Sequence, residues 1–346
     1  MKNNFSCEET SRLCELLGMP SFILPWLDRF YQSAEIAWIL TFSPESSVNA
    51  KNKNQAASNE PYAQKSSSKF LERCHRRAVA DLNADGKHIP AGFHKRYEIW
   101  ALFEGWQDIP SEIRSRLNQW ELQYFIETKQ PLIKNYKNSG LRDQAVVWPE
   151  YVLLDEALAL IDKVPQIYLW PCNCRAMMKA CNKSELVCLR FQNNRNLGWE
   201  ISKQRGKDIM LAAHKLGLMQ SAEIGIAADG SIDGAICNCC SDCCYPVQLA
   251  NYLNVAGLYP LRRYLADFNA EKCTTCGRCV KRCPFQAFRL APVATEDTEA
   301  TQMQVHFNAD DCRGCGLCST TCPEDAIEMQ PLPPSPVSIL AQILND

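Results

Sequence analysis

The sequence lacks several features that mark common classes of protein. No apolar run approaches the roughly 20 residues that a membrane-spanning helix requires. The first twenty residues hold one lysine and no apolar stretch followed by small residues, so no secretory signal is expected. The formal net charge is -2, which argues against a polyanion-binding protein. These absences predict a soluble, cytoplasmic protein with no membrane span and no nucleic-acid partner.

Nucleotide-binding motifs are missing as well. Neither G-x-G-x-x-G after a strand nor G-x-x-x-x-G-K-[ST] occurs in the chain. No flavin, nicotinamide or nucleotide cofactor is therefore expected, and any chemistry must come from other residues.

Cysteine, by contrast, is abundant, with 20 residues in a chain of 346. Most of these cysteines stand in tight groups within a long chain that has no signal peptide. In a reducing compartment such grouping indicates metal or cluster ligation by thiolates rather than a disulfide scaffold.

Composition divides the chain into six predicted segments of a multidomain α+β protein. They are N-terminal helices (1–42), a flexible linker rich in Ser, Asn, Lys and Ala (43–69), a helical domain (70–165), a small cysteine-rich α+β domain (166–268), a domain with two regular cysteine motifs (269–330) and a Pro-rich tail (331–346).

Beyond the N-terminal helices, three further helices are predicted. One begins at Ser111, a suitable N-cap, and the others cover residues 151–164 and 206–216. The tail ends in apolar residues such as Leu340 and Ile343. Packing of these residues onto their own domain is favoured over docking to a partner.

The strongest pattern is a repeated C-x2-C-x2-C-x3-C-P run. Its copies are Cys273, Cys276, Cys279 and Cys283 before Pro284, and Cys312, Cys315, Cys318 and Cys322 before Pro323. In this run three cysteines wrap one 4Fe-4S cube and the fourth ligates the neighbouring cube. Cluster one is therefore assigned to Cys273, Cys276, Cys279 and Cys322, and cluster two to Cys312, Cys315, Cys318 and Cys283. Paired zinc sites are the alternative, but these usually use two pairs of cysteines.

Residues around the motifs suit cluster binding. Gly277, Gly314 and Gly316 allow backbone amides to approach the cluster sulfurs. Apolar residues that follow each proline are expected to shield the cubes from water, namely Phe285, Ala287, Phe288, Ala326 and Ile327.

The last sixty to seventy-five residues resemble the bacterial-type two-cluster ferredoxins. The resemblance implies a pseudo-symmetric fold of two short hairpins and two helices that carries single electrons at low potential between partners. The connection over residues 289–311 looks longer than in the smallest members of that family. The eight cysteines nevertheless keep their places in the motif.

The middle of the chain holds a second constellation of nine cysteines: Cys172, Cys174, Cys181, Cys188, Cys237, Cys239, Cys240, Cys243 and Cys244. Their spacing matches neither the ferredoxin run nor a standard zinc finger. A third 4Fe-4S cluster is favoured, and a structural zinc site or redox-active thiols remain open. Arg175 either offsets the charge of a thiolate-bound cluster or lies at the surface, and His214 is expected to be a satisfied helix residue rather than a ligand.

From residue 70 onward the chain is also similar to a poorly characterised group of 4Fe-4S dicluster proteins from anaerobic bacteria, through its P-C-N-C-R block, its C-N-C-C block and the terminal motifs. The resemblance implies a non-catalytic electron carrier, or an electron-transfer subunit, that serves a partner oxidoreductase in anaerobic metabolism.

Two alternatives stay open. One is a reductase whose reactive site is the middle constellation. The other is a redox-sensing regulator that uses basic residues of the helical domain, Lys69, Arg73, Arg76 and Arg77, although acidic neighbours interrupt them.

Overall fold

The computed structural model describes residues 6–43, 67–140, 147–227, 230–293, 302–335 and 338–345. The chain forms two compact units: Met1–Gln123 with Asn193–Leu197, and Tyr124–Gln192 with Gly198–Asp346. The predicted linker over 43–69 falls almost wholly outside the described residues. Among the helices described, none is both long enough and apolar enough to cross a membrane.

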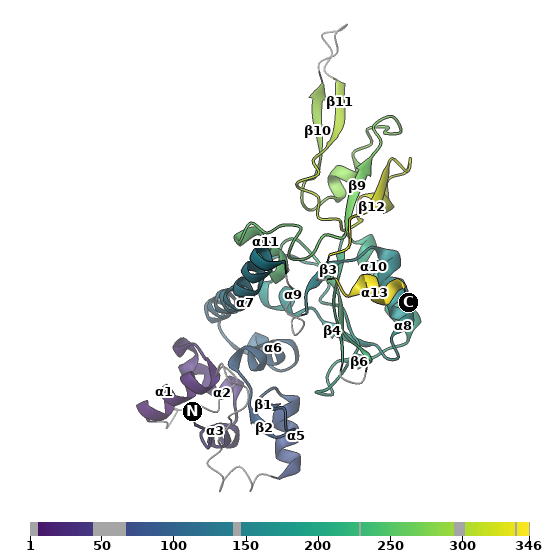
Figure 1. Cartoon of the computed structure of the whole chain (residues 1–346). Helices are drawn as coiled ribbons and strands as arrows, with labels where there is room; N and C mark the ends of the chain where they lie inside the picture. The colour runs from purple at the N-terminus through teal and green to yellow at the C-terminus, as the bar shows by residue number, and fades with distance from the viewer. Residues whose placement is uncertain are drawn as a thin grey trace. The chain divides into compact units, whose positions relative to one another are not determined.

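The first unit is mainly helical (Figure 1). Its elements are α1 (Cys7–Leu17), the 3-10 helix η1 (Ser21–Trp26), α2 (Leu27–Phe30), α3 (Ser33–Ile39), α5 (Ser68–Arg76), the hairpin strands β1 (Ala80–Leu82) and β2 (His88–Pro90), α6 (Phe93–Phe103), the 3-10 helix η3 (Trp106–Asp108) and the first part of α7 (Ser111–Ser139). Helix α1 starts in a capping box of Ser6 and Glu9, which satisfies free N–H groups of its first turn.

A buried ion network joins the helices of this unit. The fully buried Arg96 donates to both carboxylate oxygens of Glu104, at 2.8 and 2.5 Å, and to the carbonyl oxygens of Phe30 and Arg77. Arg77 in turn pairs with the fully buried Glu35. Burial alone would raise the pKa of Glu104, but hydrogen bonds from Arg96 and Arg77 outweigh it and lower that pKa.

The second unit combines helices with several sheets. Its elements are the end of α7, β3 (Pro149–Tyr151), α8 (Leu154–Lys163), β4 (Tyr168–Pro171), α9 (Asn173–Met178), β5 (Leu186–Arg190), β6 (Trp199–Glu200), α10 (Lys203–Lys215), β7 (Met219–Ile226), β8 (Ile232–Cys239), α11 (Tyr245–Tyr252), β9 (Tyr264–Phe268), α12 (Arg278–Arg282), β10 (Phe288–Val293), β11 (Gln302–Phe307), the 3-10 helix η4 (Ser319–Thr321), β12 (Ile327–Pro331) and α13 (Leu340–Asn345).

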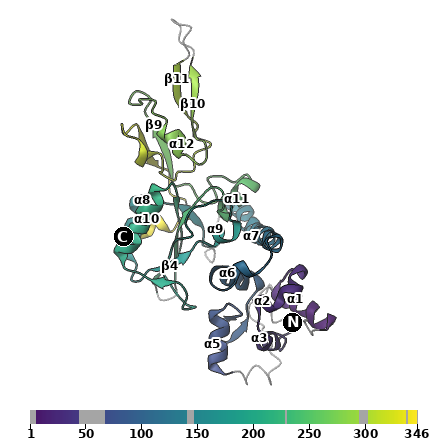
Figure 2. The same cartoon turned by 180° about the vertical axis from the view of Figure 1, so that it is seen from behind.

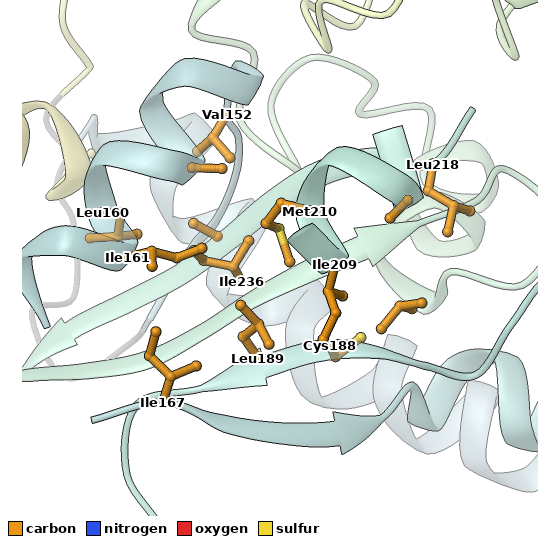
Figure 3. Close-up of a cluster of buried hydrophobic side chains, with 14 of the residues drawn as sticks. Val152, Leu160, Ile161, Ile167, Cys188, Leu189, Ile209, Met210, Leu218 and Ile236 are labelled. Atoms are coloured by element: carbon orange, nitrogen blue, oxygen red, sulfur yellow. The ribbon is translucent and has the colours of Figure 1, made fainter. Parts of the chain in front are cut away.

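A six-stranded antiparallel sheet organises the second unit, with the strand order β3-β7-β8-β5-β4-β6. Helices α8 and α10 cover one face of this sheet (Figures 1 and 2). Figure 3 shows the core between them, where Leu160, Met210, Leu189 and Ile236 meet. The predicted α+β class is confirmed.

Several predicted elements can be compared with the structure. The helix predicted from Ser111 is α7, and the helix predicted over 206–216 is α10. The prediction over 151–164 was too long, because Tyr151 pairs with Ser221 as the last residue of β3 and the helix begins at Leu154.

The tail packs onto its own unit, as predicted. Leu340 is buried in the core between the sheet and α8. The Ser338 hydroxyl donates to Glu150 at 2.6 Å, and the Ile339 amide donates to the same carboxylate at 3.1 Å. Burial raises the pKa of Glu150, although Ser338 and Arg263 act against this rise.

The terminal cysteine motifs lie in a small region of two antiparallel strand pairs, β10 with β11 and β9 with β12. Strands β10 and β11 are consecutive, whereas β9 and β12 join the start and the end of the region. The resemblance implied two helices here, and the structure has α12 and the three-residue η4. The long connection includes residues 294–301, which lie outside the described residues.

Replacing Glu104 with Gln tests the ion network. Glu104→Gln leaves the guanidinium of Arg96 buried without its counter-charge, so local stability should fall by about 3 kcal/mol or more at pH 7. Hydrogen-exchange mass spectrometry of peptides from α6 measures this loss. The control Glu72→Gln removes the charge of an exposed carboxylate that accepts a hydrogen bond from Ser68, and it should leave α6 protected.

The same comparison has a defined pH dependence. The pKa of Glu104 is lower in the folded protein than its unfolded pKa near 4.5. Its contribution to folding stability is therefore fully present above the unfolded pKa and is lost as the pH falls through the folded pKa. Wild type and Glu104→Gln should therefore converge in acid. A difference that persists there would contradict the assigned role.

Candidate metal centres

Four cysteines of the terminal motifs line one cavity. Cys283, Cys312, Cys315 and Cys318 border it together with Gly314, Gly316 and the apolar side chains of Phe285, Phe288, Leu317 and Met329. Three of these cysteines come from the second motif, and Cys283 is the fourth cysteine of the first. Four sulfurs around one apolar cavity suit the donor set of a 4Fe-4S cube.

The electrostatics of these thiols reflect the same grouping. Burial raises the pKa of Cys315 to about 12, and the neighbouring Cys283 and Cys312 add to the rise. Burial also raises the pKa of Cys318, with further contributions from Cys315, Cys312 and Cys283. Cys283 thus lies near the sulfurs of the other motif, as its predicted cross-ligation requires.

Of the remaining four cysteines, three belong to the first motif and Cys322 to the second. Burial raises the pKa of Cys279 to about 11, and Cys273 and Cys276 add to it. Cys322 packs on the core that contains Cys279, as does Cys273.

Backbone amides donate to sulfur at equivalent places in the two motifs. The Ala287 amide donates to Cys283 at 3.3 Å, and the Ala326 amide donates to Cys322 at 3.3 Å. Such N–H donors stabilise negative charge on sulfur and tune cluster potential. Ala287 and Ala326 are both buried, as expected for residues that exclude water.

Gly314 has the backbone conformation that its place beside the cavity requires. Its φ is +72°, and a Cβ added there would lie 2.2 Å from the carbonyl oxygen of Tyr264. A side chain is therefore excluded both by strain and by space.

Six of the nine middle cysteines are linked electrostatically in a closed order, called here the six-thiol ring. The pKa of each thiol is shifted by the thiols before and after it in the order Cys172, Cys174, Cys244, Cys239, Cys237, Cys188 and back to Cys172.

Strand pairing and helix starts explain the ring. Cys237 and Cys239 point to the same face of β8, because side chains alternate along a strand. The pairing of β5 with β8 brings Cys188 beside Cys237. Cys172 and Cys244 are the N-cap residues of α9 and α11.

Two thiols of the six-thiol ring have lowered pKa values. Hydrogen bonds from Cys188 and Cys239 lower the pKa of Cys237 to about 6. Hydrogen bonds from Cys174 and Cys239 lower the pKa of Cys244 well below its usual value. These two positions favour the thiolate, which is the form that binds metal.

The other three middle cysteines, Cys181, Cys240 and Cys243, form a separate group, called here the three-thiol group. Their sulfurs all lie within 4.8 Å of one another. The distances from Cys181 to Cys240 and to Cys243 are both 3.7 Å. Cys240 and Cys243 are buried, and Cys181 is partly exposed.

Arg175 lies between the two groups. Its side chain is 1% exposed, so the surface position considered from sequence is wrong. Its guanidinium donates to the carbonyl oxygens of Ser184 and Asn238. Burial lowers the pKa of Arg175, but the thiols of Cys172, Cys240 and Cys188 outweigh burial and raise it.

His214 is a satisfied helix residue, as predicted. Its Nδ1 pairs with the side-chain oxygen of Gln220 at 2.7 Å, and its Nε2 pairs with the Thr320 hydroxyl at 2.7 Å. Burial lowers its pKa. Neither ring nitrogen faces a cysteine, so His214 joins α10 to the region of the terminal motifs instead of binding metal.

One hydrophobic cluster contacts both the six-thiol ring and the terminal cavity. It contains Cys239 and Cys244 from the ring, Cys315 from the cavity, and the buried Tyr151 and Leu317. Burial raises the pKa of Tyr151, and the thiols of Cys244, Cys315 and Cys239 add to it. Tyr151 is therefore close to sulfurs of both groups. Sequence reasoning missed this role, because Tyr151 was assigned to a helix.

These observations define a two-cluster iron-sulfur domain within the chain. Residues 272–326 match the family described as a 4Fe-4S dicluster domain. The chain therefore carries a 4Fe-4S dicluster domain with two 4Fe-4S clusters, and it is a metal-binding protein with an electron-transfer role. No significant match to the chain was found among curated proteins or among solved structures.

Replacing Cys283 tests whether this cysteine is a cluster ligand. In Cys283→Ala one cube loses a ligand although the second motif is intact, so iron should fall by about four atoms per chain. Anaerobic iron and acid-labile sulfide analysis measures the loss. The control Cys7→Ala changes an exposed cysteine outside these groups and should keep all iron. Full iron in Cys283→Ala would rule out the assignment.

Proposed function

We propose that this chain is an iron-sulfur electron-transfer protein that carries single low-potential electrons between a partner oxidoreductase and a third iron-sulfur cluster held by the six-thiol ring. The dicluster domain takes the electron from the partner or returns it. Cluster one uses Cys273, Cys276, Cys279 and Cys322, and cluster two uses Cys312, Cys315, Cys318 and Cys283. Of these two clusters, cluster two is the one that exchanges electrons with the cluster of the six-thiol ring.

The observation that carries this proposal is the hydrophobic cluster shared by Cys315, Cys239 and Cys244. Tyr151 lies among these three sulfurs and is buried. Close packing without water favours electron transfer between the two sites, because dense protein leaves no gap for the electron to cross.

Contacts within the second unit hold the dicluster domain against the ring. Arg282 donates to the carbonyl oxygens of His214 and of Lys215, at the end of α10. Arg263 and Tyr264 both reach Glu156 of α8, each at 2.8 Å. These contacts support a fixed distance between cluster two and the ring.

Charge also supports a cluster in the ring. A buried guanidinium is costly unless negative charge lies beside it. Among the residues described, Arg175 has no carboxylate partner within ion-pair distance, and the titratable groups beside it are the thiols of Cys172, Cys188 and Cys240. A thiolate-bound iron-sulfur cluster supplies that negative charge.

The surroundings proposed for this function are the cytoplasm and anaerobic metabolism, since reduced low-potential clusters are sensitive to oxygen. The regulator alternative gains no support from the basic residues of the helical domain. Arg77, one of those residues, is engaged by Glu35 and Glu104 within its own unit.

Metal content tests the third cluster. Purified without oxygen, the protein should contain about twelve iron and twelve sulfide per chain. Replacing Cys172 and Cys239 together with Ala should reduce both by about four, and Cys7→Ala should change neither. About eight of each in wild type, unchanged by the double replacement, would limit the chain to its two terminal clusters.

Electron flow is tested by flash photoreduction of the anaerobic protein. In wild type the ring cluster should be reduced from cluster two in a phase independent of protein concentration. In Cys283→Ala, which should lack cluster two, that phase should disappear and reduction should become concentration-dependent. An unchanged internal phase in Cys283→Ala would contradict the path through cluster two.

A further inference from the structure

The three-thiol group differs from every other cysteine group in how close its sulfurs are. Among the residues that the structure describes, no other three cysteine, histidine or carboxylate ligand atoms lie within 4.8 Å of one another. The terminal cysteines, which hold the two cubes, are thus more widely spaced than Cys181, Cys240 and Cys243.

The spacing distinguishes two kinds of metal centre. In a cubane each cysteine binds a different iron atom, so the sulfurs stand far apart. Around a single tetrahedral zinc ion with Zn–S bonds of about 2.3 Å, two sulfurs lie about 3.8 Å apart. The observed 3.7 Å from Cys181 to each partner matches the single ion.

We propose that Cys181, Cys240 and Cys243 bind one zinc ion, separately from the iron-sulfur cluster of the six-thiol ring, and leave its fourth coordination position to a ligand from solvent. Three protein ligands with one open position are the arrangement of reactive zinc sites, whereas structural sites are closed by four. The part of the chain that is described offers no fourth ligand within the same distance.

Exposure indicates where the fourth position opens. Cys240 and Cys243 are buried, whereas Cys181 is partly exposed. Cys181 follows α9, on the side of the group nearest to solvent. A water molecule can therefore reach the ion past Cys181 and complete the tetrahedron.

Arg175 provides an independent observation. Three thiolates around a divalent zinc ion carry one net negative charge, which the guanidinium offsets. The Arg175 Nε is buried without a partner, and Cys240 is among the thiols beside its guanidinium. A buried cation with an unpaired N–H beside the thiols suits a site that carries negative charge or takes a further ligand atom.

Zinc and iron analysis of one variant tests the site. Protein produced with both metals should contain about one zinc per chain. Cys181→Ala should lose that zinc and keep its iron, because Cys181 is outside the six-thiol ring. The control Cys7→Ala should keep both. A loss of about four iron in Cys181→Ala would make Cys181 a cluster ligand and overturn the zinc site.

X-ray absorption spectroscopy at the zinc edge, applied to the wild-type protein, gives a test that does not depend on the folding of a variant. We expect three sulfur neighbours and one oxygen. Four sulfurs would mean that another cysteine closes the site, and the absence of bound zinc would overturn the site itself. Iron content is measured separately, so failure of the zinc site is distinguishable from failure of the electron-transfer proposal.

Discussion

Strand β8 lies between β7 and β5, and this pairing decides where the middle cysteines meet. Cys188 and Cys237 are about fifty residues apart in sequence, yet they become neighbours because β5 and β8 run antiparallel side by side. The alternation of side chains then keeps Cys237 and Cys239 on one face and places Ile236 on the other, in the core. The same strand therefore builds both the ring and the core that supports it.

Charge balance is the second constraint on the middle domain. Arg175 is buried with backbone carbonyl oxygens and thiols around it. Without negative charge on sulfur this arrangement would cost several kcal/mol. The metal centres proposed for the middle domain would supply that charge, and Arg175 lies close to thiols of both the ring and the three-thiol group.

An electron-transfer role depends on how the domains of the second unit are held together. Tyr151 belongs to the sheet that carries the ring, and it also packs beside Cys315 of the dicluster domain. Hydrogen bonds of Glu156 with Arg263 and Tyr264, and of His214 with Thr320, also join helices α8 and α10 to residues of the terminal region. The proposed zinc site lies apart from this path, because its cysteines do not belong to the shared hydrophobic cluster.

The sequence by itself determined the two terminal clusters, because each C-x2-C-x2-C-x3-C-P run places three ligands of one cube on a short loop and its repeat supplies the fourth. It also predicted α7 and α10, whose apolar spacing is local. Only the tertiary structure decided how nine middle cysteines divide into six and three, since that division depends on strand pairing across about fifty residues. The roles of Tyr151 and Arg175 were likewise decided by burial, which a local pattern does not encode.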